Sequence, residues 1–98
     1  MAFVGKVSDV APGQLVAVDV EGTSVLVANV DGRLFAIGDM CTHRGCSLAE
    51  GELSGKVVTC PCHGGEFDVT NGQVITGPPK EPTPAYPVQV AGDEFRIG

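Results

Sequence analysis

The sequence predicts a single all-β domain, and three observations support that prediction. The chain has 98 residues, which gives room for one hydrophobic core but not for two. It contains 14 glycines and 7 prolines, a content that favours many turns. Short stretches alternate apolar and polar residues, and none keeps a helical period over the ~11 residues that an amphipathic helix needs.

The first third of the chain predicts a three-stranded antiparallel meander. Valines alternate with other residues along 14–20, residues 24–30 form a second apolar run, and residues 33–38 form a third. The pairs Glu21-Gly22 and Asp31-Gly32 lie between these runs, and such pairs are typical of tight hairpin turns.

The last third predicts strands again, at residues 73–76, 86–90 and 94–97, and the last two would form a hairpin. The middle third differs, because it holds all four cysteines and both histidines and has only short apolar runs, at 56–59 and 67–69. The predicted architecture is therefore an antiparallel, sandwich-like β base of residues 1–38 and 72–98. A small ligand-bearing insert of residues 39–71 interrupts this base.

Charge and composition exclude several classes of function. The net charge is -6 and the pI is about 4.6, which argues against nucleic-acid binding and favours a basic face on any protein partner. The N-terminus lacks the pattern of a signal peptide, and no apolar run approaches the ~18 residues of a membrane span. We therefore expect a cytoplasmic protein without membrane contact. Cysteine clusters in that compartment are more often metal sites than disulfides.

The cysteines and histidines form two short motifs of metal-ligand type. One is Cys41-x-His43 and the other is Cys60-x-x-His63, so each motif offers one sulfur and one nitrogen. Four such ligands could close a tetrahedral zinc site. A single intervening residue strains Cys41 and His43 onto one metal, whereas two irons bridged by sulfide would let each motif reach both.

These motifs, in the contexts CTHRGC (residues 41–46) and CPCHG (residues 60–64), resemble those of the Rieske [2Fe-2S] family. A glycine-proline segment at residues 77–79 resembles the third loop of that family, so the resemblance covers nearly the whole chain. It implies the Rieske fold and one [2Fe-2S] cluster. Cys41 and Cys60 would bind one iron, and His43 and His63 would bind the other.

The resemblance also implies roles for the residues around the ligands. Cys46 and Cys62 match a cysteine pair of cytochrome bc-type Rieske proteins and would form a disulfide; the alternative is two small buried thiols. High-potential relatives carry hydroxyl side chains where this chain has Gly65 and Phe67, so we expect a low-to-intermediate reduction potential. Six residues are expected to surround the ligands: Arg44, Gly45, Gly64, Gly65, Phe67 and Pro78.

The resemblance implies an electron carrier and not an enzyme. Both histidines would serve as ligands, and no nucleophile–base pair, phosphate-binding loop or small-molecule substrate site is evident. The implied partners are a flavoprotein reductase as donor and a terminal oxygenase as acceptor. The alternatives are a small electron-transfer subunit of a respiratory or metabolic oxidoreductase, a structural zinc domain, and a module like the small subunit of nitrite reductase.

Overall fold

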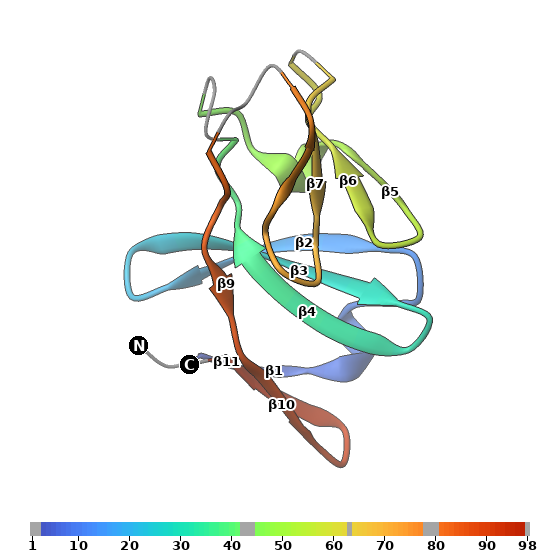
Figure 1. Ribbon diagram of the computed structural model, residues 1–98. Helices are drawn as coiled ribbons and strands as arrows, with labels where there is room; N and C mark the ends of the chain where they lie inside the picture. Colours follow the sequence, from blue (N-terminus) through green and yellow to red (C-terminus); the bar gives the residue numbers. More distant parts are fainter. Residues whose placement is uncertain (1–2, 42–44, 63, 78–80, 98) are drawn as a thin grey trace.

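The computed structural model describes residues 3–41, 45–62, 64–77 and 81–97, and most of their regular structure is β-strand. All strand pairs are antiparallel and form three small sheets (Figure 1). The helical elements among the described residues are two short 3-10 turns, η1 (Val7–Asp9) and η2 (Leu48–Glu50). No helix in these ranges is long and apolar enough to cross a membrane. The predicted all-β class is confirmed.

The central sheet is the predicted meander with one added strand. Its order is β2-β3-β4-β9, with strands β2 (Leu15–Val20), β3 (Thr23–Val30), β4 (Arg33–Gly38) and β9 (Ala85–Tyr86). Both central residues of each predicted turn have positive φ, with values of 53° and 85° at Glu21-Gly22 and 52° and 92° at Asp31-Gly32. Positive φ at both positions matches the right-handed twist of the flanking strands, which explains why these pairs close the hairpins.

The second sheet joins the two ends of the chain in the order β1-β11-β10. Its strands are β1 (Phe3–Lys6), β10 (Val88–Ala91) and β11 (Glu94–Ile97). The predicted strand 86–90 is in fact two strands that belong to different sheets and are separated by Pro87. Proline has no N–H to donate to a ladder, so the chain leaves the central sheet there. Strand β1 was not predicted from the sequence.

The third sheet carries the ligand region and has the order β5-β6-β7-β8. Its strands are β5 (Glu52–Ser54), β6 (Val57–Thr59), β7 (Glu66–Asp68) and β8 (Val74–Thr76). Three of them match predicted runs to within one residue, and β5 was not predicted. Because this sheet continues to Thr76, it includes residues that the sequence assigned to the base; the exact division of the chain into base and insert remains a prediction.

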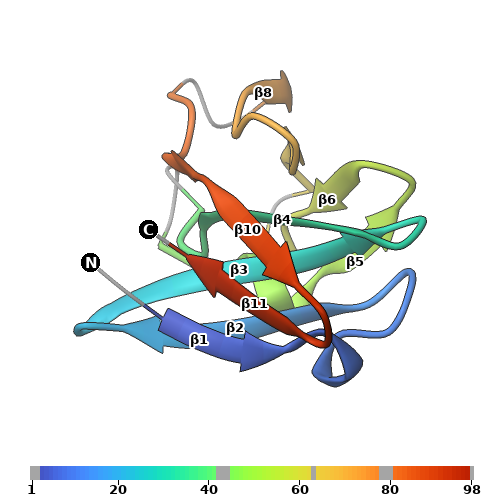
Figure 2. The same cartoon turned by 90° about the horizontal axis from the view of Figure 1, so that it is seen from below.

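Strand β3 separates two apolar cores, because both of its faces are covered. Val25 and Val27 pack with Phe95 and Ile97 of the second sheet. Leu26 and Ala28 point the other way, into the core that the third sheet closes. Figure 2 shows β10 and β11 lying across the central sheet on the side away from β5 and β6. Burial on both faces explains why β3 reads as an almost unbroken apolar run.

Candidate metal centre

Two of the four cysteines are free thiols at the ends of strands that face the same core. Cys41 follows β4 and Cys60 follows β6, and both belong to the core between the central and third sheets. They are 3% and 2% exposed, respectively. The described residues that come after them, 45–47 and 61–62, lie at one end of the molecule (Figure 1). The structure thus places two buried sulfurs beneath one tip.

The loop after β4 is closed by two backbone hydrogen bonds to Cys41. The N–H of Cys41 donates to the carbonyl oxygen of Cys46 at 2.8 Å, and the N–H of Gly45 donates to the carbonyl oxygen of Cys41 at 2.8 Å. Gly45 has a φ of 72°, a conformation that glycine adopts without steric cost. Both ends of the loop are therefore held at the cysteine.

The loop after β6 repeats this geometry. The N–H of Cys60 donates to the carbonyl oxygen of Gly65 at 2.7 Å, and the N–H of Gly64 donates to the carbonyl oxygen of Cys60 at 3.1 Å. Gly64 has a φ of 73°. A glycine with positive φ therefore occurs at the same point of both loops. Their place around a bound cluster remains a prediction.

The other two cysteines form a disulfide between these loops. Cys46 and Cys62 are bonded, with their Cα atoms 6.5 Å apart and a sequence separation of 16. That Cα separation lies within the usual range for a disulfide. Cys46 is partly buried and Cys62 is exposed, so the bond reaches the surface. The pair is therefore not available for a metal, and the sulfurs left to bind one are those of Cys41 and Cys60.

Several of the predicted site residues lie outside the described residues. These are His43, Arg44, His63 and Pro78. Their roles as ligands or neighbours remain predictions. Gly65 and Phe67 are described, and both are buried; Phe67 is fully buried in the same core as Cys41 and Cys60.

A buried acidic residue before the first loop was missed by sequence reasoning. Asp39 is 4% exposed, and its carboxylate accepts hydrogen bonds from the hydroxyls of Ser24 and Ser47 and from the N–H of Ala49. Ser47 and Ala49 follow the loop, whereas Asp39 precedes it, so one side chain joins its two ends. A lone aspartate after an apolar strand and two residues before a predicted ligand is the signal that could have identified it.

Asp68, at the end of β7, anchors the third sheet on the side away from the loops. Burial tends to raise the pKa of this carboxyl, but hydrogen bonds from the Thr70 side chain and backbone and the neighbouring Lys56 ammonium outweigh it, so the pKa is lowered. The Thr70 hydroxyl and the Asp68 Oδ1 are 2.5 Å apart, and the Lys56 Nζ is 3.3 Å from Oδ2. The carboxylate is therefore held in its ionised form.

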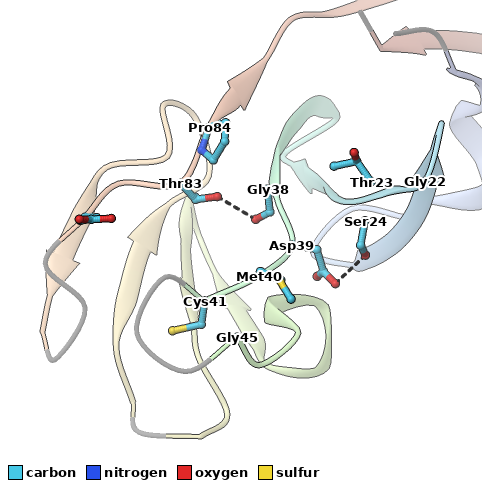
Figure 3. A pocket seen from close by; sticks show the side chains of 11 residues that line it. Gly22, Thr23, Ser24, Gly38, Asp39, Met40, Cys41, Gly45, Thr83 and Pro84 are labelled. Carbon is cyan, nitrogen blue, oxygen red and sulfur yellow. Dashed lines mark hydrogen bonds between the residues drawn. The ribbon is translucent and has the colours of Figure 1, made fainter.

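The segment before β9 is docked by Thr83 against the end of β4 and the turn at Gly72. The Thr83 hydroxyl donates to the carbonyl oxygen of Gly38 at 3.2 Å, and its N–H donates to the carbonyl oxygen of Gly72 at 2.9 Å (Figure 3). A Cβ at either glycine would collide with Thr83. An open groove of about 720 Å³ lies beside this contact and includes Cys41 and the exposed side chain of Met40.

Comparison with known proteins identifies this architecture. A family model described as the Rieske [2Fe-2S] domain matches residues 1–87. The chain belongs to the Rieske family. The predicted family, fold and cofactor are thereby confirmed, because membership implies one Rieske-type [2Fe-2S] cluster.

Named relatives of this Rieske chain are ferredoxin components of dioxygenase systems. It is 44% identical over 93 residues to the biphenyl dioxygenase ferredoxin subunit of Pseudomonas sp. (strain KKS102), covering 94% of this chain and 85% of the relative. The ferredoxin of carbazole 1,9a-dioxygenase from Nocardioides aromaticivorans IC177 superposes with a TM-score of 0.91 at 32% identity, covering 96% and 92% of the two chains. A chain in a complex of reduced oxygenase and oxidized ferredoxin in carbazole 1,9a-dioxygenase gives a TM-score of 0.92 at 35% identity, covering 98% and 91%.

The described residues fit a Rieske cluster. A cluster of this type needs two thiolates and two imidazoles, and two buried free thiols lie at the starts of two loops with matching hydrogen bonds. Among the described residues no group of three or more metal-ligating side chains is found; both histidines lie outside those residues. Because the disulfide occupies the remaining cysteines, the donor set left in the chain is two cysteines and two histidines.

Proposed function

We propose that this Rieske protein is a cytoplasmic one-electron carrier that accepts electrons from a flavoprotein reductase and passes them to a terminal oxygenase. The names of its relatives support this role, since they are ferredoxin components of aromatic-ring dioxygenase systems. The solved complex of an oxygenase with a similar ferredoxin supports the choice of acceptor. The acidic net charge of -6 suits docking on a basic face of either partner.

The chain's own residues would divide the work of holding the cluster. The thiolates of Cys41 and Cys60 would bind one iron, and the imidazoles of His43 and His63 would bind the other. When bound, the cluster supplies reversible uptake of one electron. Residues 39–71 carry the ligands, and residues 1–38 and 72–98 support them as a base. The buried position of the two sulfurs keeps water from the thiolate side.

The observation that carries this proposal is the division of the cysteines into two free buried thiols and one disulfide. A structural zinc domain would use the four ligands for one metal and would not transfer electrons. A module like the small subunit of nitrite reductase lacks the ligands, whereas this chain has all four in its sequence. An electron-transfer subunit of a respiratory oxidoreductase would hold the same cluster and differs only in its partners.

The cluster is tested by metal content and electron paramagnetic resonance (EPR). The purified protein should contain two irons and two acid-labile sulfides per chain, and its dithionite-reduced form should give a Rieske-type signal. Cys41→Ser or Cys60→Ser should abolish that signal, while the double variant Cys46→Ser/Cys62→Ser, the matched control, should retain it. Colourless protein with one zinc per chain would reject the assignment.

The partners are tested by electron transfer in both directions. A flavoprotein reductase of an aromatic-ring dioxygenase system should reduce the protein with NADH or NADPH, and the reduced protein should be oxidised by the matching terminal oxygenase in the presence of its aromatic substrate. Electron transfer only with respiratory partners would favour the alternative. Replacing His63 with alanine gives the control, because loss of the cluster must stop both half-reactions.

A further inference from the structure

Asp39 is a buried aspartate that lines the same groove as Cys41, a proposed cluster ligand. It follows β4, lies two residues before Cys41, and is 4% exposed. Its Oδ2 accepts hydrogen bonds from the hydroxyls of Ser24 at 2.9 Å and Ser47 at 2.7 Å, and its Oδ1 accepts the N–H of Ala49 at 2.9 Å. Figure 3 draws the Asp39–Ser24 contact, and Asp39 and Cys41 both line the groove shown there.

In each of these contacts the Asp39 side chain is the acceptor. The donors are neutral hydroxyl and amide groups. Among the described residues no lysine or arginine is ion-paired with Asp39, whereas the similarly buried Asp68 has Lys56 at 3.3 Å. Neutral donors stabilise the anion where it is but leave its net charge in place.

The same contacts hold the first cluster loop in place. The Asp39 backbone carbonyl accepts the N–H of Leu48 at 2.6 Å, and its N–H donates to the carbonyl oxygen of Ser24 at 3.2 Å. Residues on both sides of the loop are thereby joined to each other and to the start of β3. These hydrogen bonds hold the Asp39 side chain in one orientation between the start of β3 and the residues that follow the loop.

A fixed negative charge in a poorly solvated site opposes the arrival of an electron nearby. We propose that the Asp39 carboxylate lowers the reduction potential of the Rieske cluster, in addition to orienting its first loop. This inference rests on the proposed function, because it requires a cluster at Cys41. It assigns part of the low potential expected of this chain to a charge, and not only to the hydroxyls missing at Gly65 and Phe67.

The test is Asp39→Asn with redox titration of the iron-loaded protein. The amide has the same shape; its NH₂ group can donate to both serine hydroxyls, which can also accept, and its oxygen can still accept the Ala49 N–H. We expect an unchanged EPR line shape and a reduction equilibrium constant at least about tenfold larger, which is ~59 mV for a one-electron couple. The matched control is Asp93→Asn, an exposed carboxylate in the β10–β11 turn at the opposite end of the molecule (Figure 1), which should change that constant less than about threefold.

A cluster-containing Asp39→Asn protein whose potential stays within about threefold of wild type would overturn the inference, as would an equal shift in Asp93→Asn. If Asp39→Asn fails to assemble a cluster, Ser24→Ala is the deciding variant. This variant keeps the Asp39 carboxylate but removes the Ser24 hydroxyl, whose hydrogen bond partly offsets the charge of that carboxylate. Its potential should fall by at least about threefold, and an unchanged potential would overturn the inference. Wild-type protein without a Rieske signal would refute the proposed function itself, which separates the two failures.

Discussion

The disulfide between the cluster loops gives the sharpest test of how this small domain is stabilised. Replacing both Cys46 and Cys62 with serine removes the bond and leaves no unpaired thiol beside the ligands. A single replacement would leave one thiol free to compete for iron or to crosslink two chains. The double variant should still load its cluster, because the proposed ligands Cys41 and Cys60 are untouched.

The magnitude follows from the length of chain that the bond closes. With a separation of 16 residues, the loss of unfolded-state restraint is worth about 3 kcal/mol. For a domain of this size each kcal/mol shifts the unfolding temperature by roughly 4–8 °C, so the largest expected drop is about 12–24 °C. The cluster joins Cys41 to Cys60 and restrains an overlapping segment, so the loaded protein should lose less than this maximum.

Thermal unfolding of iron-loaded protein, followed by circular dichroism and by the visible absorbance of the cluster, measures this effect. Wild type treated with a phosphine reductant, with its thiols counted and its iron content unchanged, is the control and should reproduce the drop. The wild-type protein used for comparison must be shown to have its disulfide oxidised. If the double variant then unfolds less than about 4 °C below wild type, the reasoning is refuted. The bond would then be a consequence of loop proximity and not a source of stability.

Three further changes test other parts of the fold. Thr83→Val keeps the side-chain shape but removes the hydrogen bond to Gly38, and should lower the free energy of unfolding in urea by about 1–2 kcal/mol. Folding lowers the pKa of Asp68 below its ordinary value of 3.8. The carboxylate therefore stabilises the fold fully above that pH, and this contribution is lost as the pH falls through the folded pKa. Asp68→Asn should make the free energy of unfolding depend less on pH at the acid end. Gly51→Ala places a Cβ against the carbonyl oxygen of Thr59 and should cost about 1–3 kcal/mol.

Each of these predictions has its own control. Thr23→Val changes an exposed threonine in β3 and should leave the free energy of unfolding within about 0.5 kcal/mol of wild type. For the acid end of the stability profile, the control is Asp31→Asn, which removes an exposed carboxyl. An equal flattening of the profile in Asp31→Asn and Asp68→Asn would contradict a specific role for Asp68. For Gly51, an alanine variant as stable as wild type would show that β6 and the turn before β5 can separate without cost.

The sequence by itself determined the class of the fold, the meander and the candidate ligands, because these depend on local chemistry. Glu21-Gly22 and Asp31-Gly32 predicted their turns through backbone conformations that few residue pairs tolerate. The two Cys–His motifs predicted a metal centre through ligand type and spacing alone. The sequence did not predict the break at Pro87. It also did not predict β1 (Phe3–Lys6), because this strand is stabilised by pairing with β11 (Glu94–Ile97) at the other end of the chain.

The family resemblance predicted that Cys46 and Cys62 are bonded, but the local sequence also allowed two buried thiols, and only the tertiary structure excludes that alternative. The bond between Cys46 and Cys62 depends on a Cα separation of 6.5 Å across two loops, a distance that no local pattern encodes. In the same way, Asp39 reads as an ordinary surface aspartate until donors from β3 and from beyond the loop converge on it. Burial and hydrogen-bond partners arise from segments far apart in sequence, so the charge environment of the cluster is a property of the fold.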